Sequence, residues 1–173
     1  MATSRMSERP GRERPIPAAG QESVWDYPRP PRVESSSERV VIRFGGEVIA
    51  DTTAALRVLE ESHPPAYYLP RSAFVDGALL PAPGISYCEF KGEASYLSVS
   101  AGGDLMESAA WHYPVSQPGY EQLRDHVSVY PGRMDACLVD GELVEAQSGG
   151  FYGGWITARI VGPFKGDPGT EGW

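Results

Sequence analysis

The sequence predicts an all-β domain, rich in turns, with only one or two short helices. Its 173 residues include 16 prolines and 20 glycines, which rarely occupy long helices or central strands because they remove hydrogen bonds or cost backbone entropy. Short runs of β-branched and aromatic residues are separated by turn dipeptides along most of the chain, and we find no internal repeat. The number of such runs indicates roughly eight to ten short strands.

Three pairs of β-rich runs predict hairpins. Gly45-Gly46 and Asp140-Gly141 are two-residue turns of the kind that needs positive φ, and Lys91-Gly92-Glu93 joins the third pair. The paired ranges are 40–44 with 47–50, 136–139 with 142–144, and 85–90 with 94–99. We also expect a hairpin turn at Asp76-Gly77, by the same turn chemistry.

Two other segments are assigned from periodicity. Residues 54–61 fit either an irregular strand or two turns of helix, and we favour the strand. Residues 118–127 predict a short helix, since Pro118 suits a first-turn position and Leu123 with Val127 are spaced i, i+4.

The chain divides into a tail, an arm and one domain. Residues 1–22 contain no aromatic residue, so we expect a disordered tail that lacks the apolar burial needed to offset ordering entropy. Residues 23–38 are rich in proline and predict an extended arm, with Trp25 and Tyr27 as packing anchors. Residues 39–173 form the expected single β domain.

Charge is unevenly distributed. The formal net charge is -8, and the first 33 residues hold six arginines and four acids, which leaves nine basic and 19 acidic groups for the rest. An acidic surface repels phosphate backbones, so we expect no nucleic-acid partner for the folded part. The basic N-terminus is the one segment for which contact with a polyanion stays open.

The cysteine content argues against a disulfide framework or a structural zinc site. Cys88 and Cys137 are too few and too far apart for either, so we expect no metal or other cofactor. No apolar stretch approaches the ~20 residues needed to cross a bilayer, and no signal-peptide segment is evident. We therefore expect a cytoplasmic protein with no membrane partner.

Several blocks resemble the domain of unknown function 427 family. Residues 149–157 (Gly-Gly-Phe-Tyr-Gly-Gly-Trp-Ile-Thr), 161–166 and 168–170 are similar to the C-terminal signature of that family. The further blocks are 62–68, 88–92 and 110–114, so the likeness covers residues 25–173. At Phe90 the chain departs from the family pattern, which more often has tryptophan.

The resemblance implies a β-tent, in which two antiparallel sheets lean together at one edge. Zinc-bearing folds of this kind, such as type B methionine sulfoxide reductases, hold the tent with two pairs of cysteines, which this chain lacks. Hydrophobic burial alone is then expected to hold the fold. The family is also labelled nucleotidyltransferase-like, but no alternating carboxylate pair follows Gly45-Gly46 to hold metal ions, so this activity is a less favoured alternative.

A group of aromatic residues near glycine or proline forms the candidate ligand site. These side chains are either buried core or the walls of a cleft that admits a small planar or cationic ligand. Four glycines surround Tyr152 and Trp155 and would let a ligand approach closely. The candidate ligand-binding residues are Trp111, Tyr113, Tyr152, Trp155 and Tyr68.

Three polar residues are the candidate catalytic or orienting groups. Glu89 and Lys91 alternate on a predicted strand and so share one face. There they form either a solvated ion pair or an acid and base in a cleft. His63, in a rigid turn before two prolines, is the best candidate for a general base.

Together these residues predict a domain that binds a small organic molecule in an aromatic cleft, either as a binding protein or as an enzyme without a cofactor. The alternative is a non-catalytic protein-interaction module that uses the same aromatic surface or the proline-rich arm. Exposed sheet edges would also allow a homodimer.

Overall fold

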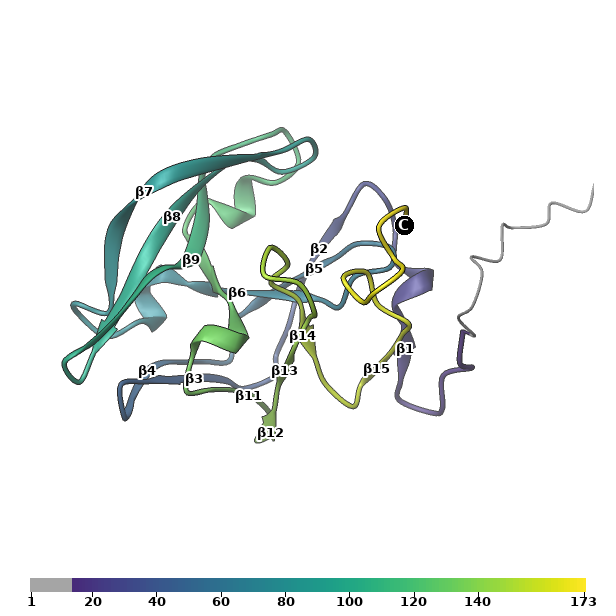
Figure 1. The fold of residues 1–173 in the computed structure, drawn as a ribbon, viewed down its shortest axis with the longest axis horizontal. Coiled ribbons are helices and arrows are strands. Elements are labelled where there is room, and N and C mark those ends of the chain that lie inside the picture. The colour runs from purple at the N-terminus through teal and green to yellow at the C-terminus, as the bar shows by residue number, and fades with distance from the viewer. Residues whose placement is uncertain (1–13) are drawn as a thin grey trace, which may run out of the picture.

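The computed structural model describes residues 14–173, and their fold is mainly β, as predicted (Figure 1). In the described part of the chain the helical elements are four 3₁₀ turns of three residues each. The strands are β1 (Glu22–Ser23), β2 (Arg32–Ser35), β3 (Val40–Phe44), β4 (Glu47–Thr52), β5 (Leu56–Leu59), β6 (Ala66–Pro70), β7 (Leu79–Cys88), β8 (Gly92–Ala101), β9 (Asp104–Ser116), β10 (His126–Val129), β11 (Ala136–Val139), β12 (Glu142–Leu143), β13 (Glu145–Ala146), β14 (Trp155–Ile156) and β15 (Ile160–Val161). The 3₁₀ turns are η1 (Val24–Asp26), η2 (Arg71–Ala73), η3 (Glu121–Leu123) and η4 (Pro131–Arg133).

Two antiparallel sheets build the body. The larger has seven strands in the order β2-β5-β6-β10-β9-β8-β7, and the smaller has four in the order β12-β11-β3-β4. The main core lies between them, because inward side chains of both sheets belong to one buried cluster that includes Ile42, Ile49, Leu69, Val99 and Val127. Two further two-stranded sheets, β1 with β15 and β13 with β14, join the C-terminal segment to this body.

The predicted hairpins form where positive-φ dipeptides occur. Gly45 and Gly46 adopt φ of 61° and 76° between β3 and β4, and Asp140 and Gly141 adopt 48° and 81° between β11 and β12. A side chain at Gly45 would also collide with the backbone of Ala101. The pair predicted at 85–90 and 94–99 is present as β7 and β8, both of which run longer than expected. Residues 56–59 form a strand, the favoured alternative for that segment.

Two local predictions are wrong. Residues 118–127 form only the three-residue η3, and Val127 belongs to β10, where it pairs with Leu69 of β6. A β-branched residue that fits a sheet position outweighs one i, i+4 spacing. Asp76-Gly77 is a turn, but it joins η2 to β7 and does not connect two paired strands.

Residues 23–38, predicted to be an extended arm, include the end of β1, the turn η1 and the whole of β2. β1 pairs in parallel with β15, and β2 pairs with β5 along its whole length. Trp25 donates a hydrogen bond from Nε1 to the carbonyl oxygen of Pro163 at 2.9 Å. The folded body therefore begins before residue 39, because main-chain pairing incorporates this segment.

We predicted a disordered tail over residues 1–22. Residues 1–13 of this range lie outside the described residues. The part that is described contacts the body, since Gln21 Nε2 donates to the carbonyl oxygen of Ala158 at 2.9 Å. No helix among residues 14–173 is long and apolar enough to span a bilayer.

A buried arginine ties the N-terminal strands to the large sheet. Arg57 of β5 has only 1% of its side chain exposed, and it forms ion pairs with Glu22 at 2.8 Å and Glu34 at 2.6 Å. Arg159 extends the network, with ion pairs to Glu22 at 2.7 Å and Glu38 at 3.0 Å. Because a buried guanidinium without its carboxylates is costly, the position of β1 depends on this network.

The network makes the acid stability of the fold depend on Glu22. Burial raises the pKa of Glu22, but bonds from Arg57 and Tyr27 outweigh it and lower the pKa to about 2. A carboxyl whose folded pKa is below its unfolded value stabilises the fold at higher pH, and this contribution is lost as pH falls from about 4.5 towards about 2.

Glu22→Gln is therefore expected to lower the free energy of unfolding at pH 7 by about 1–3 kcal/mol. The difference from wild type should shrink as pH falls below about 4.5. Urea denaturation at a series of pH values measures both effects. Glu47→Gln, at an exposed position, is the matched control and should change little. Equal effects of the two substitutions at every pH would contradict the role of Glu22.

Candidate functional site

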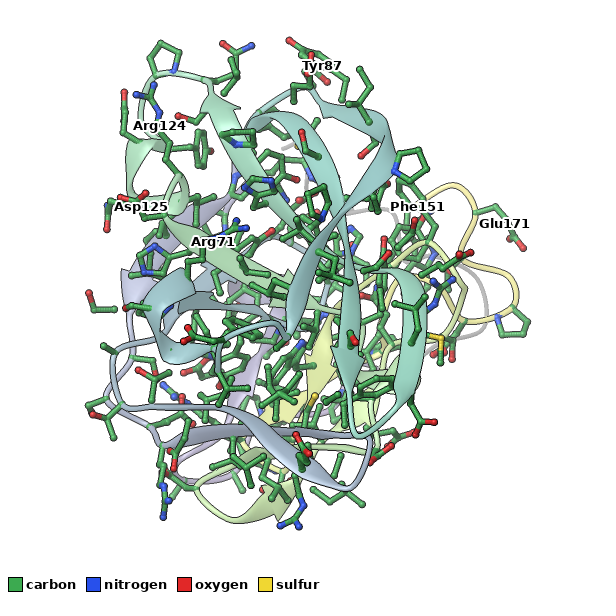
Figure 2. The ribbon with its side chains drawn as sticks, turned by 90° about the vertical axis from the view of Figure 1, so that its left-hand side faces the viewer. Arg71, Tyr87, Arg124, Asp125, Phe151 and Glu171 are labelled. Atoms are coloured by element: carbon green, nitrogen blue, oxygen red, sulfur yellow. The ribbon has the colours of Figure 1, made fainter. Side chains whose placement is uncertain are left out.

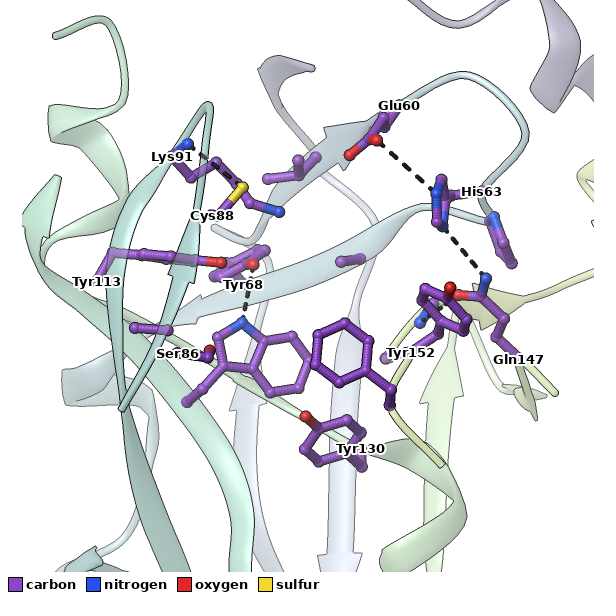
Figure 3. Close-up of a pocket in the computed structure, with 18 of the residues that line it drawn as sticks. Glu60, His63, Tyr68, Ser86, Cys88, Lys91, Tyr113, Tyr130, Gln147 and Tyr152 are labelled. Carbon is purple, nitrogen blue, oxygen red and sulfur yellow. Dashed lines mark hydrogen bonds and ion pairs between the residues drawn. The ribbon is translucent and has the colours of Figure 1, made fainter. Parts of the chain in front are cut away.

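A cavity of about 320 Å³ opens beside the large sheet (Figure 3). Aromatic side chains from β6, β8 and β9 form one side of it, and residues 147–154 form the opposite wall. The lining residues are Val58, Glu60, His63, Pro64, Ala66, Tyr68, Ser86, Tyr87, Cys88, Lys91, Ala94, Tyr96, Trp111, Tyr113, Tyr130, Gln147, Phe151, Tyr152, Gly153 and Gly154.

The apolar part of the cavity is built around the Trp111 indole. Trp111 and Tyr113 project from the same face of β9, because side chains alternate along a strand. Trp111 Nε1 donates to the hydroxyl of Tyr68 at 3.0 Å, so the polar atom of the indole is satisfied while its ring faces other rings. Tyr130 packs 4.6 Å from Trp111 between ring centroids. Trp111 and Tyr113 are predicted from the sequence to lie either in the core or around a cleft, and both side chains are buried and also line the cavity.

Two adjacent glycines let the 147–154 segment lie directly on these walls. A Cβ at Gly153 would overlap the six-membered ring of Trp111, and a Cβ at Gly154 would press on the side chains of Gln147 and Pro64. Neither glycine has positive φ, so space, and not backbone conformation, requires glycine here. The close approach predicted from the Gly-rich run therefore occurs, but the partner is a protein side chain.

Gln147 fixes the orientation of His63. The Gln147 Oε1 accepts from the Gly154 N–H at 3.1 Å, so its Nε2 is the donor, and it reaches the Lys165 carbonyl oxygen at 2.6 Å and His63 Nδ1 at 3.3 Å. His63 Nδ1 must then be the acceptor, and the neutral imidazole carries its proton on Nε2. That N–H faces Glu60, whose Oε2 lies 3.7 Å from His63 Nε2.

This geometry makes His63 a hydrogen-bond donor. Burial lowers the pKa of His63, the positive charges of Arg29, Lys91 and Lys165 lower it further, and the result is about 4. At neutral pH the ring is uncharged and its lone pair at Nδ1 is occupied by Gln147. The arrangement therefore disfavours the general-base role predicted for His63, and favours donation from Nε2.

Lys91 and Glu89 do not share a strand face as predicted. β7 ends at Cys88, and residues 89–91 form the turn into β8, so the alternation on which the pairing was based stops before Glu89. Glu89 is exposed and does not line the cavity, whereas Lys91 lines it with its Nζ 5.6 Å from the centroid of the Tyr113 ring.

Of the candidate residues, six line the cavity and two do not. The six are His63, Tyr68, Lys91, Trp111, Tyr113 and Tyr152. The two that do not are Glu89 and Trp155. The side chain of Trp155 is fully buried in the main core, and its Nε1 donates to the Val129 carbonyl oxygen at 3.3 Å. β14 turns this ring inward, which the glycine pattern around it could not reveal.

Sequence reasoning missed several lining residues, above all Gln147, Glu60 and Tyr130. The only signal for Gln147 is its place just before the Gly-rich run. Tyr130 precedes Pro131 after a short apolar run, a context shared by many core residues. Their roles come from contacts between segments far apart in the chain.

The family model described as domain of unknown function 427 (DUF427) matches residues 32–140, more than half of the chain. No curated protein matches the sequence. Within residues 14–173, no cluster of three or more histidine, cysteine, aspartate or glutamate side chains is placed to hold a metal ion.

Gly153→Ala is expected to destabilise the protein by about 1–3 kcal/mol, because its methyl group would displace the Trp111 indole. Urea denaturation followed by tryptophan fluorescence measures the change. Gly150→Ala is the matched control, since it is exposed and a Cβ there meets no atom within 4 Å. Equal stability of both variants would contradict the tight packing of Gly153 on Trp111.

The protonation state of His63 is measurable by NMR titration. We expect a pKa of about 4 and a ¹⁵N shift pattern typical of the Nε2–H tautomer. Arg29→Gln should raise the pKa of His63, because it removes a nearby positive charge and frees Glu60 from its 3.5 Å ion pair with Arg29. An Nδ1–H tautomer, or a pKa unchanged from that of a free histidine, would contradict the assignment.

Proposed function

We propose that the chain, which belongs to the domain of unknown function 427 family, binds a small planar organic molecule in the cavity that Trp111 and the 147–154 segment help to line. The observation that carries this proposal is a hollow of about 320 Å³ with aromatic walls and a small number of polar groups. Small-molecule sites in proteins usually have this composition, and they measure about 300–1,000 Å³. The volume suits a ligand of one or two fused rings.

The arrangement of walls supports a planar shape. Tyr152 approaches from the 147–154 segment, and its ring lies 5.5 Å from the His63 ring. Trp111 and Tyr130 also line the cavity. Aromatic rings stack with offset or edge contacts at such separations, so a flat ligand can contact several rings at once. Figure 3 shows Tyr152, His63 and Gln147 together on one side of the cavity, with Tyr113, Tyr68 and Lys91 across from them.

The polar groups support recognition of the ligand more than its conversion. His63 offers an N–H and has its lone pair engaged, so it orients an acceptor more readily than it removes a proton. Among the lining residues, which belong to the described part of the chain, Glu60 is the single carboxylate. Metal-assisted nucleotidyl transfer uses several clustered carboxylates, so we do not extend the proposal to that activity.

A second candidate function, a protein-interaction module, is supported by exposed hydrophobic side chains on β7 and β9. Tyr87, Glu93 and Val115 are directly opposite one another on β7, β8 and β9, and so share one sheet face. Tyr87 has 70% of its surface exposed, and Val115 has 64%. Ile85, two residues before Tyr87, is also 64% exposed. Figure 2 shows Tyr87 at the edge of the molecule, away from the core. Exposed hydrophobic side chains on one sheet face are a common feature of partner surfaces.

A thermal-shift screen with small planar metabolites tests the first function. Compounds that bind the native state must raise the Tm, and Tyr152→Ala should abolish most of that rise because it removes one wall of the cavity. Leu105→Ala, at an exposed position of β9 outside the cavity, should respond as wild type does. A screen without hits, or hits unaffected by Tyr152→Ala, would contradict the proposal and favour the interaction module.

A further inference from the structure

We propose that the ligand is an organic acid, whose carboxylate contacts the Lys91 ammonium while its ring lies against the aromatic side chains that line the cavity. This inference rests on the proposed function and adds the charge of the ligand. It follows from the position of one cation among the aromatic walls.

Lys91 presents its charge to the cavity because of the turn that precedes β8. Residues 89–91 form this turn, and the Lys91 N–H donates to Cys88 Sγ at 3.5 Å, which holds the backbone in place. Its side chain lines the cavity and its Nζ faces the Tyr113 ring. Within residues 14–173, no carboxylate lies within 4 Å of Lys91 Nζ.

The other charged group of the cavity already has partners. Glu60 forms an ion pair with Arg29 at 3.5 Å and faces the Nε2 of His63 at 3.7 Å. The positive charge of Arg29 therefore offsets the carboxylate of Glu60, and Lys91 is the charged lining residue that forms no ion pair within 4 Å among residues 14–173. A buried or half-buried cation favours an anion in direct contact.

The groups around Lys91 keep it protonated. Burial lowers the pKa of Lys91, but Tyr68, Cys88, Glu60 and Tyr120 raise it, and the net effect is a pKa above the usual value. An amine in this state is a poor nucleophile towards a carbonyl carbon. Lys91 thus suits an ionic contact and does not suit a Schiff base.

A carboxylate matches this site better than a phosphate group does. The lining residues offer one ammonium, that of Lys91, and the neutral His63 lies across the cavity from it (Figure 3). Sites for phosphate commonly combine arginine forks or several backbone N–H groups around the anion. A single positive charge therefore suits a singly charged acid group.

Calorimetric titration with 2-naphthoate and 2-naphthamide tests the inference. The two probes have the same ring and nearly the same shape, and they differ in charge. Wild type should bind 2-naphthoate at least about tenfold more tightly than 2-naphthamide, as expected for a hydrogen bond to a charged group. This comparison needs no variant, so it does not depend on how well a substituted chain folds.

Substitutions then assign the preference to Lys91. Lys91→Met should abolish the preference for 2-naphthoate and leave the affinity for 2-naphthamide almost unchanged, while Lys91→Arg should retain part of it. Arg71→Met removes the same charge at an exposed position outside the cavity (Figure 2), and it should have no effect on either probe. Circular dichroism and urea denaturation show whether each variant is folded.

The outcomes separate this inference from the proposed function. Binding of both probes with equal affinity in wild type, sensitive to Tyr152→Ala, overturns the acid inference and leaves the aromatic site in place. A preference for 2-naphthoate that Lys91→Met does not reduce also overturns it. Failure of both probes to bind wild type contradicts the inference, and the broader metabolite screen then decides the proposed function independently.

Discussion

The cavity depends on one buried carboxamide, that of Gln147. It donates to the Lys165 carbonyl oxygen and to His63 Nδ1, and it accepts from the Gly154 N–H. These bonds join the two ends of the 147–154 wall to each other and to the turn that follows β5. Each buried polar group left without a partner costs about 1–3 kcal/mol, so the wall, the tautomer of His63 and the shape of the cavity are maintained together.

Ion pairs of Arg159 also attach the C-terminal part of the chain to the body. Arg159 contacts Glu22 and Glu38, and Arg57 contacts Glu22 from within the large sheet. The expectation that hydrophobic burial alone holds this fold is therefore incomplete. Hydrophobic packing forms the core between the two sheets, but hydrogen bonds and ion pairs position the chain ends around it, and one chain end carries a wall of the cavity.

The features that the sequence predicted well are those controlled by neighbouring residues. Gly45-Gly46 and Asp140-Gly141 form hairpins because positive φ is a local requirement. Glu89 and Lys91 were misplaced because alternation applies only while a strand continues, and β7 ends one residue before Glu89. The burial of Trp155 and the role of Gln147 depend on contacts with β10 and with His63. Contacts of that kind leave no trace in the local pattern.

The cavity draws its two kinds of wall from different parts of the chain. Lys91 and Trp111 lie inside the region matched by the family model, whereas Gln147 and Tyr152 lie beyond its end. The turn before β8 therefore supplies the charge, the large sheet supplies aromatic walls, and the C-terminal segment forms the opposite wall. Under the proposed function, substitutions at Lys91 are expected to change which functional group a ligand can carry, and changes in residues 147–154 are expected to alter how large its ring can be. Gly153 connects the two, because the absence of its side chain lets the closing segment rest on Trp111.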